Sequence, residues 1–423
     1  MGEKLSKLKN VYHKYGAAGF VKKLFRYADA NVVTRLGAET RLHPDKVRRQ
    51  IRQMLAEDYD RVILWRSSFG YQVPLFQRPQ HIARCLTEGR SLVLYEVTTM
   101  TDPVRTLRRQ SERLWLVDLN NAPFRKLLME ELEKVEKPKY LQIYSTNWEM
   151  PLSELLEYRR KGFHVLYEYI DDLSPEVRGT ATLPKNISDK YDYVMAHPDC
   201  TVVVTAELLR QDVLAHRGGE NLAFSSNGVD YAFFQSFGEY AFDPDFQAVL
   251  DRGKPIVCYY GALAKWFDYE LVKKLSATGK YSVVLFGVKY DESFDEHLRG
   301  QEDIYFLGPR DYQALKYYAR EAAVLMIPFL INDVTRATSP LKVFEYMALH
   351  KPIVTTDMDE CRRYRSVLIG HDHEEFLAQV ERAMALREDA AYLALLDEEA
   401  SANDWHAKAA AIEEQLRRAE ERA

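Results

Sequence analysis

The sequence predicts an α/β protein made of two doubly wound domains, and three observations support this prediction. The 423 residues are too many for one typical core and suggest two domains of about 150–200 residues each. Short apolar runs with strand character alternate with segments whose apolar residues recur at helical spacing. Residues 236–253, which include Gly238, Pro244 and Gly253, separate two such alternating regions and indicate a linker.

The composition is that of a soluble globular protein, with 47% hydrophobic and 29% charged residues. The net charge of -5 argues against a general nucleic-acid binder. No apolar run approaches the roughly 20 residues that span a bilayer, and the amino terminus lacks a signal peptide's apolar core, so we expect a cytoplasmic protein. The four cysteines are far apart and indicate neither a zinc site nor a disulfide framework: Cys85, Cys200, Cys258 and Cys361.

Residues 1–58 are expected to form a basic helical extension. Up to residue 28, seven lysine and arginine residues face one glutamate, a balance of +6 that leaves -11 on the rest of the chain. Leu5, Leu8 and Phe20 contribute to an apolar side, as expected if residues 4–28 lie on an anionic membrane face. The alternative is a helical extension that packs on the protein or on a partner subunit.

The first domain is expected over residues 59–235. A helical pattern at Val47, Ile51 and Met54 leads to it, and a further helix begins at Arg78, where Pro79 suits the first turn. Apolar runs predict its strands at 61–65, 91–95, 114–117, 140–144, 163–170, 193–197 and 201–205.

Polar residues near the carboxyl ends of these strands are candidates for a ligand site, because doubly wound sheets bind ligands at that edge. After the first strand we name Arg66, Ser68 and Arg78; the alternative is a solvated turn and an arginine at a helix start. After the strand at 163–170, Asp171 and Asp172 are placed to hold a hydroxyl group, or one of them to act as a base. We prefer Asp172, although Asp172 or Ser174 is equally suited to cap the next helix.

The second domain is expected over residues 254–400, followed by a final helix over 401–423. Its first strand runs into Gly261 and Ala262, and the missing side chain of Gly261 would let backbone N–H groups approach a phosphate. A helix is expected to start at Lys265. Further strands are predicted at 282–287, 304–308, 324–329 and from Ile353.

The segment 338–356 predicts a loop, a helix and a strand. Thr338 or Ser339 can cap the helix, Pro340 suits its first turn, and the apolar residues that follow recur at helical spacing. The helix amino terminus would offer free N–H groups to an anion, Lys342 adds a charge suited to phosphate, and Glu345 can accept hydrogen bonds from a ribose diol. The alternative is a surface pair worth roughly a few tenths of a kcal/mol.

Several of these stretches resemble group 1 glycosyltransferases of the GT-B fold, which are family 4-like. Residues 339–354 look like the donor-binding segment of that family, and residues 259–268 look like the opening of its donor domain. Weaker similarities cover about residues 60–415, at 77–83, 167–172, 227–230 and Trp405. More narrowly, the sequence resembles bacterial enzymes of teichuronic-acid and capsule polysaccharide assembly.

The resemblance implies two Rossmann-like domains with an interdomain cleft. The acceptor domain would be 59–235, the donor domain 254–400, and the helix 401–423 would cross back to the first domain. Glu345 would hold the nucleotide ribose, while Lys342 with the amides of Ser339 and Leu341 would hold the diphosphate.

The remaining candidate roles combine the resemblance with the chemistry of the residues. Arg310 would border the nucleotide base, and Gly261 with Ala262 would line the donor site. Asp172, Lys342 and Arg336 are the catalytic candidates, because Arg336 could share the charge that develops on the leaving diphosphate. The acceptor would contact Arg66, Ser68 and Arg78. No D-x-D-like pair suggests a metal clamp, so we expect no metal and no cofactor beyond the nucleotide sugar itself.

One position departs from the family pattern. Many retaining members carry a second Glu eight positions before the ribose-binding one, where it touches the donor sugar, but Ala337 stands there in this sequence. A retaining reaction is favoured by the resemblance alone.

The predicted function is transfer of a sugar from a nucleotide-diphosphate donor to a hydroxyl of a glycan or lipid-linked acceptor in cell-surface polysaccharide assembly. Two alternatives are a GT-B nucleotide-sugar epimerase and a non-catalytic GT-B subunit that supports a partner enzyme. The basic amino-terminal segment favours a membrane-bound acceptor, with the protein peripheral on the inner face of the plasma membrane, and therefore favours a transferase.

Overall fold

The computed structural model describes residues 43–67, 69–73, 76–97, 102–173, 183–301, 304–336 and 338–422. The expected membrane segment 4–28, Ser68 and Ala337 lie outside these ranges. The described residues form two compact units. The first takes those of Met1–Val73, Arg90–Leu141 and Lys161–Phe163, and the second takes those of Pro74–Gly89, Gln142–Arg160 and His164–Ala423. Within the described ranges, no helix combines the length and the apolar character needed to cross a membrane.

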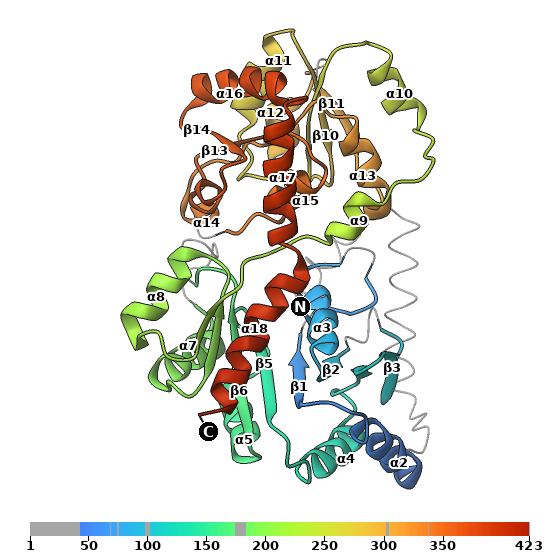
Figure 1. The fold of residues 1–423 in the computed structure, drawn as a ribbon, viewed down its shortest axis with the longest axis vertical. Helices are drawn as coiled ribbons and strands as arrows, with labels where there is room; N and C mark the ends of the chain where they lie inside the picture. Colours follow the sequence, from blue (N-terminus) through green and yellow to red (C-terminus); the bar gives the residue numbers. More distant parts are fainter. Residues whose placement is uncertain are drawn as a thin grey trace, which may run out of the picture. The chain divides into compact units, whose positions relative to one another are not determined.

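The first unit is built on the strand run β3-β4-β2-β1. Strands β1, β2 and β4 pair in parallel, and β3 pairs antiparallel with β4 at the edge. Nearly every residue of β1 and β2 is buried, as expected of parallel strands that are covered on both faces. Two helices, α2 and α4, pack against each other (Figure 1). Arg48 of α2 donates to Glu131 of α4 at 3.0 Å. The bounds are α2 Pro44–Leu55, β1 Arg61–Arg66, β2 Ser91–Glu96, β3 Leu107–Ser111, β4 Leu114–Val117 and α4 Ala122–Leu132.

The second unit begins with a group of strands in which β6, β7 and β8 pair in parallel. The boundary between the units falls within β5, after Leu141, and within β6, after Phe163. The bounds in this group are α3 Arg78–Glu88, β5 Lys139–Tyr144, α5 Leu152–Arg160, β6 Phe163–Tyr169, α7 Lys185–Ala196, β7 Thr201–Val204, α8 Glu207–Arg217, β8 Leu222–Phe224, α9 Tyr231–Gln235 and α10 Pro244–Leu250.

The rest of the second unit is organised by a six-stranded sheet in the order β11-β10-β9-β12-β13-β14. All neighbouring strands pair in parallel. Every residue of β9, β10, β12 and β13 is buried, including Ser282, Thr355 and Thr356 beside the apolar residues. The strands are β9 Ile256–Tyr260, β10 Ser282–Phe286, β11 Ile304–Gly308, β12 Val324–Ile327, β13 Ile353–Thr356 and β14 Val367–Gly370.

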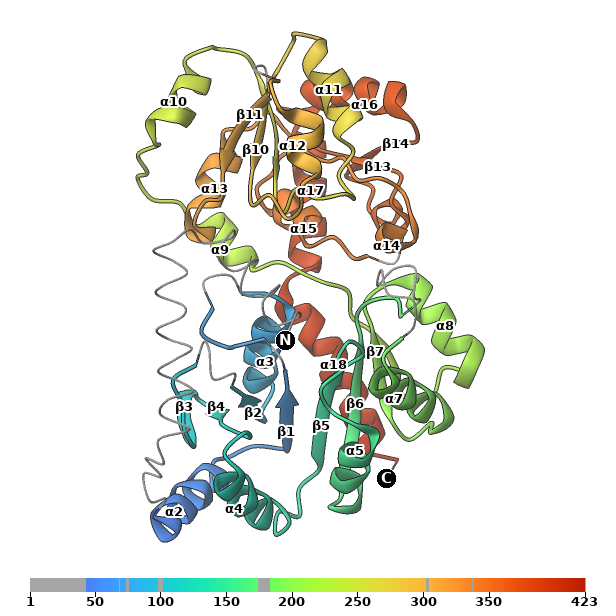
Figure 2. The same cartoon turned by 180° about the vertical axis from the view of Figure 1, so that it is seen from behind.

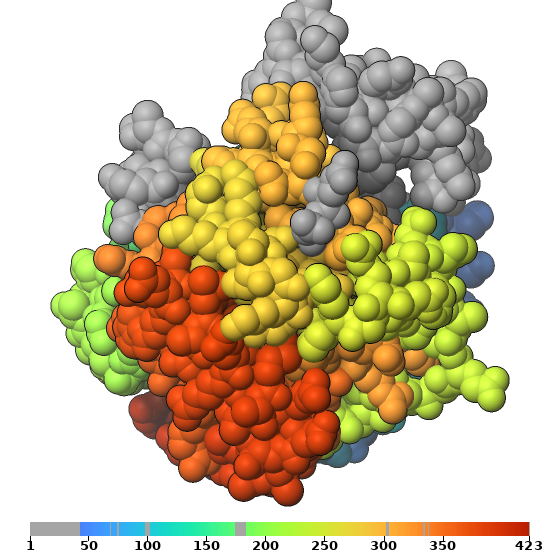
Figure 3. Space-filling view, turned by 90° about the horizontal axis from the view of Figure 1, so that it is seen from above, coloured from blue at the N-terminus to red at the C-terminus, as the bar shows by residue number. Residues whose placement is uncertain are grey.

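Helices lie on both faces of this sheet. Helix α17 lies in front of the sheet in Figure 1, whereas α11 and α12 face the viewer in Figure 2. Helix α11 contacts α12 and α16, and α15 contacts α17. In Figure 3 the orange-red surface of α16 adjoins the yellow surface of α11 and α12. The elements are α11 Tyr269–Ala277, α12 Ser293–Leu298, α13 Tyr312–Arg320, α14 Asp333–Arg336, α15 Leu341–Ala348, η1 Asp359–Arg363, α16 His373–Leu386 and α17 Ala390–Ala402.

The strand order changes direction between β9 and β12. From β9 the chain continues outward to β10 and β11, and then returns to β12 on the other side of β9. The chain therefore leaves β9 toward β10 on one side and leaves β12 toward β13 on the other side. In open α/β sheets this switch point, at the carboxyl ends of the strands, is where ligands bind.

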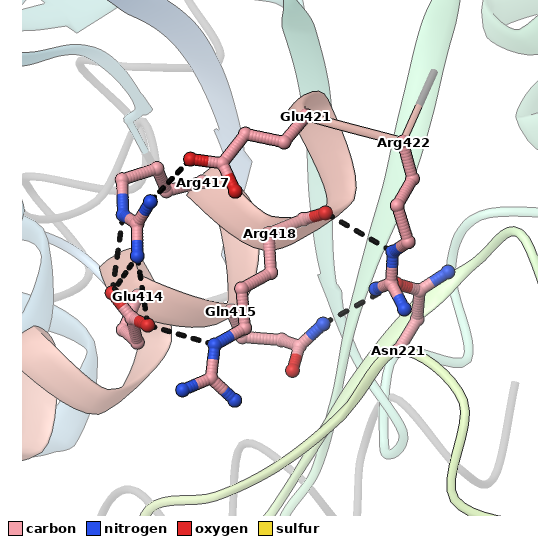
Figure 4. Close-up of polar contacts among 7 residues, drawn as sticks. All are labelled: Asn221, Glu414, Gln415, Arg417, Arg418, Glu421 and Arg422. Carbon is pink, nitrogen blue, oxygen red and sulfur yellow. Dashed lines mark hydrogen bonds and ion pairs between the residues drawn. The ribbon is translucent and has the colours of Figure 1, made fainter.

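The last helix, α18 (Trp405–Glu420), packs against α3, β7 and β8. The buried Trp405 ring stacks on His81 of α3 with the ring centroids 5.0 Å apart. At the other end of the helix, Gln415 and Arg422 both donate to the side-chain oxygen of Asn221 (Figure 4). These contacts hold α18 near both of its ends.

The structure confirms most predicted elements and corrects three. Residues 193–197, predicted as a strand, form the end of α7 and its C-cap. The helix expected to start at Lys265 starts at Tyr269, where the Asp268 side chain caps it. The expected linker contains α10 and packs on α13, since Tyr240 stacks on Tyr317 with the centroids 4.5 Å apart.

Candidate active site

Helix α15 begins at the carboxyl end of β12, beside the switch point. The predicted cap by Thr338 or Ser339 is wrong, because Pro340 occupies the N-cap and no side-chain cap bond is present among the described residues. Instead, Ser339 Oγ accepts from the Asn227 N–H at 3.3 Å, and the Ser339 carbonyl accepts from Asn227 Nδ2 at 2.8 Å. The amino terminus of α15 therefore keeps the positive end of its dipole for an anionic ligand.

Lys342 lies in the first turn of α15, against the loop that follows β9. A Cβ built on Gly261 would lie 2.3 Å from Lys342 Cε and 2.9 Å from its Nζ. A Cβ on Gly287, which follows β10, would lie 1.8 Å from the Gly261 carbonyl oxygen. The two glycines thus let two strand ends and a lysine side chain meet closely.

The observed hydrogen bonding refines the role that we expected for Gly261. Its own N–H donates to the Phe286 carbonyl at 2.9 Å, so this amide is already paired. The glycine contributes space for Lys342, and its φ of +149° is a conformation that residues with a Cβ rarely adopt.

Glu345 lies one turn after Lys342 and is almost completely buried, at 7% exposure. Its Oε2 accepts from the Tyr260 hydroxyl at 2.7 Å, and its Oε1 accepts from the Tyr312 hydroxyl at 3.0 Å. Tyr260 ends β9, and Tyr312 begins α13 after β11. Groups from β9 and α13 thus converge on one carboxylate of α15.

Burial moves the pKa values of Lys342 and Glu345 in opposite directions. It lowers the pKa of Lys342, and the nearby Glu345 carboxylate counteracts part of this effect. It raises the pKa of Glu345, while the Tyr260 and Tyr312 hydroxyls and the Lys342 ammonium work against the increase. Glu345 is buried and Lys342 is partly buried, so a ligand at these groups meets less competition from solvent than at an exposed site.

Arg310 and Arg336 occupy different environments. The Arg310 guanidinium forms an ion pair with Asp243 at 3.0 Å and donates to the Leu307 carbonyl, so described protein groups already engage its side chain. Arg336 ends α14 with its side chain exposed. The loop before it is held by Thr335, whose hydroxyl donates to the Leu330 carbonyl at 2.7 Å.

Asp172 lies three residues after the end of β6 and is partly buried. Its charge contributes to the raised pKa values of Tyr169 and Tyr191, for which burial is the main cause. The backbone just after β6 is held in place by two hydrogen bonds. The Ile170 N–H donates to Ser145 Oγ at 3.2 Å, and Thr205 Oγ1 donates to the Ile170 carbonyl at 3.1 Å.

Two candidate acceptor residues form ion pairs in the structure. Arg66 ends β1 and pairs with Glu96 at 2.8 Å. Arg78 is buried at the start of α3, where it pairs with Glu168 at 2.7 Å and donates to the Ser226 carbonyl at 2.9 Å. These contacts give Arg78 a structural role, and its contact with an acceptor stays a prediction.

Tyr260 and Tyr312 were not among the residues proposed from sequence. The available signal was position alone: Tyr260 ends β9, which borders the switch point, and Tyr312 follows β11 at the edge of the sheet. Within the described part of the chain, no group of three or more His, Cys, Asp or Glu side chains is arranged to hold a metal ion.

Sequence comparison finds a family match over the segment that carries Lys342 and Glu345. Residues 254–392 match the family described as Glycosyl transferases group 1. A proposed teichuronic acid biosynthesis glycosyltransferase, TuaH of Bacillus subtilis (strain 168), is 24% identical over 198 residues, which is 45% of this chain and 49% of that protein. The matched region thus spans about half the length of this curated relative.

Solved structures share the fold over most of the chain. A sucrose-phosphate synthase from Thermosynechococcus elongatus aligns with 86% of this chain and 100% of its own, at 16% identity and a TM-score of 0.59. An E. coli trehalose-6-phosphate structure bound with UDP-2-fluoro glucose aligns with 84% and 98%, at 14% identity and a TM-score of 0.62. Anabaena HepE in complex with UDP and glucose aligns with 85% and 99%, at 14% identity and a TM-score of 0.56.

These likenesses confirm the predicted α/β fold class with two parallel-sheet, Rossmann-like domains. The chain thus has the GT-B fold, and residues 254–392, which carry the candidate site, match the group 1 glycosyltransferases.

Proposed function

We propose that the protein transfers a sugar from a nucleotide-diphosphate donor to a hydroxyl of a glycan or lipid-linked acceptor in cell-surface polysaccharide assembly. The observation that carries the proposal is the placement of Lys342 and Glu345 on one helix turn at the switch point of the second sheet. A cation and a carboxylate at this spacing suit the diphosphate and the ribose of one nucleotide.

The chemical requirement is to stabilise the charge that develops on the departing diphosphate. The α15 amino terminus and the partly buried Lys342 supply positive charge, and partial removal from water strengthens the effect of Lys342 on a developing anion. In this proposal Ser339 and Leu341 contribute backbone contacts, Gly261 and Ala262 line the site, and Arg310 borders the base. The exposed Arg336 adds a second cation when the leaving group forms.

The acceptor half of the proposal rests on Asp172. A carboxylate at the carboxyl end of β6 can accept a hydrogen bond from the attacking hydroxyl and take its proton. Arg66, Ser68 and Arg78 remain the proposed acceptor contacts. Residues 59–235 would form the acceptor domain, residues 254–400 the donor domain, and 401–423 the returning helix.

Cell-surface polysaccharide as the product is supported by the likeness to TuaH and by the basic segment 4–28. A lipid-linked acceptor would place the protein in the cytoplasm, peripheral on an anionic membrane. Removing residues 1–28 should then abolish sedimentation with anionic liposomes. Unchanged sedimentation would remove the membrane part of the proposal.

The experiment that tests the proposal is a calorimetric screen of the purified protein against UDP, GDP, dTDP and CMP sugars. Saturable binding of one nucleotide sugar, followed by its turnover with an added acceptor, is the expected result. A donor that binds and is only epimerised would support the epimerase alternative. Binding of no nucleotide sugar would contradict the proposed function and favour a non-catalytic subunit.

A further inference from the structure

The Glu345 carboxylate is engaged by two phenol groups, one on each oxygen. Tyr260 donates to Oε2 at 2.7 Å and Tyr312 donates to Oε1 at 3.0 Å. An ionised carboxylate has about four acceptor positions, two on each oxygen. These two hydrogen bonds therefore leave one acceptor position on each oxygen.

Both tyrosine rings are held in place by their own contacts. The Tyr312 ring stacks on Phe233 with the centroids 5.4 Å apart and the planes 14° apart, and Asp311 caps its helix. Tyr260 is buried, and its ring packs edge-on against Tyr346 at 5.1 Å. The carboxylate is consequently fixed in one orientation by groups from β9 and α13.

We propose that Tyr260 and Tyr312 are positioning residues that orient Glu345 for the cis diol of a ribonucleotide, so that each remaining acceptor position receives one ribose hydroxyl. This inference rests on the proposed binding of a nucleotide donor and names its class as a ribonucleotide rather than a 2′-deoxyribonucleotide. A 2′-deoxy nucleotide would leave one buried acceptor position without its partner.

The other groups that face this carboxylate set its behaviour with pH. Lys342 and Tyr346 lie on the same helix, Tyr260 and Tyr312 donate from neighbouring elements, and Asp230 lies near Tyr312. Burial raises the pKa values of all three tyrosines above their usual range, so they remain neutral donors near neutral pH. Loss of a phenol hydrogen bond should therefore raise the pKa of Glu345 further.

The test compares Tyr312→Phe with Tyr317→Phe. Tyr317 lies on the same helix, and its hydroxyl accepts from the Gly238 N–H at 3.1 Å without touching Glu345. Dissociation constants of UDP, GDP and their 2′-deoxy forms would be measured from pH 5 to 8. We expect the wild type to bind the better ribonucleotide about tenfold more tightly than its 2′-deoxy form.

Tyr312→Phe should weaken ribonucleotide binding about tenfold, reduce the preference for the ribose form and shift the loss of binding at low pH to a higher pH. Tyr317→Phe should match the wild type. Unchanged affinity and pH dependence in Tyr312→Phe would overturn the proposal. Tighter binding would also overturn it, because the hydroxyl would then compete with the ribose.

A ligand-free measurement separates this proposal from the proposed function. In protein labelled with ¹³C-glutamate, the Glu345 carboxyl signal, assigned with Glu345→Gln, should titrate at a higher pH in Tyr312→Phe than in the wild type. If no nucleotide binds the wild type, the donor proposal fails and this titration still tests the tyrosines. An unchanged Glu345 titration would refute their positioning role.

Discussion

Lys342 passes so close to Gly261 that a single added methyl group on the glycine would lie 2.3 Å from its Cε. The lysine can reach the strand ends only because Gly261 has no side chain. The position of the Lys342 ammonium group therefore depends on Gly261, an uncharged residue.

Gly261→Ala should displace Lys342 and also strain the backbone at φ +149°. We expect a loss of about 1–3 kcal/mol in the free energy of unfolding and at least about tenfold weaker nucleotide binding. Gly279→Ala is the matched control, since Gly279 also has a positive φ of +68° but its Cβ would meet nothing within 4 Å. Urea unfolding and calorimetry measure the two effects, and equal nucleotide affinity in both variants would contradict the role of the close approach.

Glu168→Gln should destabilise the protein strongly, because it leaves the buried Arg78 guanidinium without its charge partner. The two side chains are 5% and 0% exposed, so we expect a loss of about 3–5 kcal/mol in urea unfolding. Lys185→Met removes the exposed pair with Asp189 and should cost no more than about 0.5 kcal/mol. Similar losses in the two variants would show that Arg78 does not depend on Glu168.

Lys408 should make the free energy of unfolding depend on pH in the alkaline range. Burial, with repulsion from Arg78 and Arg363, lowers the pKa of Lys408 to about 8. Between that value and the pKa of about 10.5 for an unfolded lysine, the unfolded chain binds more protons, so this residue makes stability rise with pH. Lys408→Met should remove its share of the rise, by up to about 1.4 kcal/mol per pH unit. If plots of the free energy of unfolding against pH are parallel for the variant and the wild type from pH 7 to 10.5, the predicted contribution of Lys408 is wrong.

Arg336→Met tests the proposed second cation. Because the side chain is exposed, the free energy of unfolding should change by less than about 0.5 kcal/mol. The turnover number should fall by about tenfold or more, with donor affinity within about twofold, if Arg336 acts mainly on the charge of the leaving group. A variant with wild-type turnover would exclude Arg336 from catalysis.

Five of the six strands of the second sheet could be predicted because each is a short, mainly apolar run; the exception is β14 (Val367–Gly370). Ile256–Tyr260 and Val324–Ile327 are examples, and both are completely buried. The same rule failed at residues 193–197, where an apolar run ends a helix. In the structure Ile187, Lys190 and Val194 are buried at helical spacing, which is the pattern of a helix and not of a strand. This pattern is hidden in the sequence because a lysine is not expected to be buried.

The candidate site was predictable where it depends on local order and not where it depends on distant contacts. Lys342 and Glu345 share one helix turn, so their proximity follows from spacing. The partners of Glu345 are 85 and 33 residues away in sequence, and the partner of Ser339 is 112 residues away. Only the packed sheet shows that Tyr260 and Tyr312 reach the carboxylate, or that Asn227 takes the place of a helix-cap interaction at Ser339.

The central claim is that Lys342 at the start of α15 binds the diphosphate of a nucleotide sugar. Calorimetric titration of Lys342→Met with the donor found in the screen tests it most directly, with the exposed Lys280→Met as the control. Loss of a charge-assisted contact predicts at least about tenfold weaker binding for Lys342→Met and wild-type affinity for the control. Affinity within about twofold of the wild type for Lys342→Met would contradict the account.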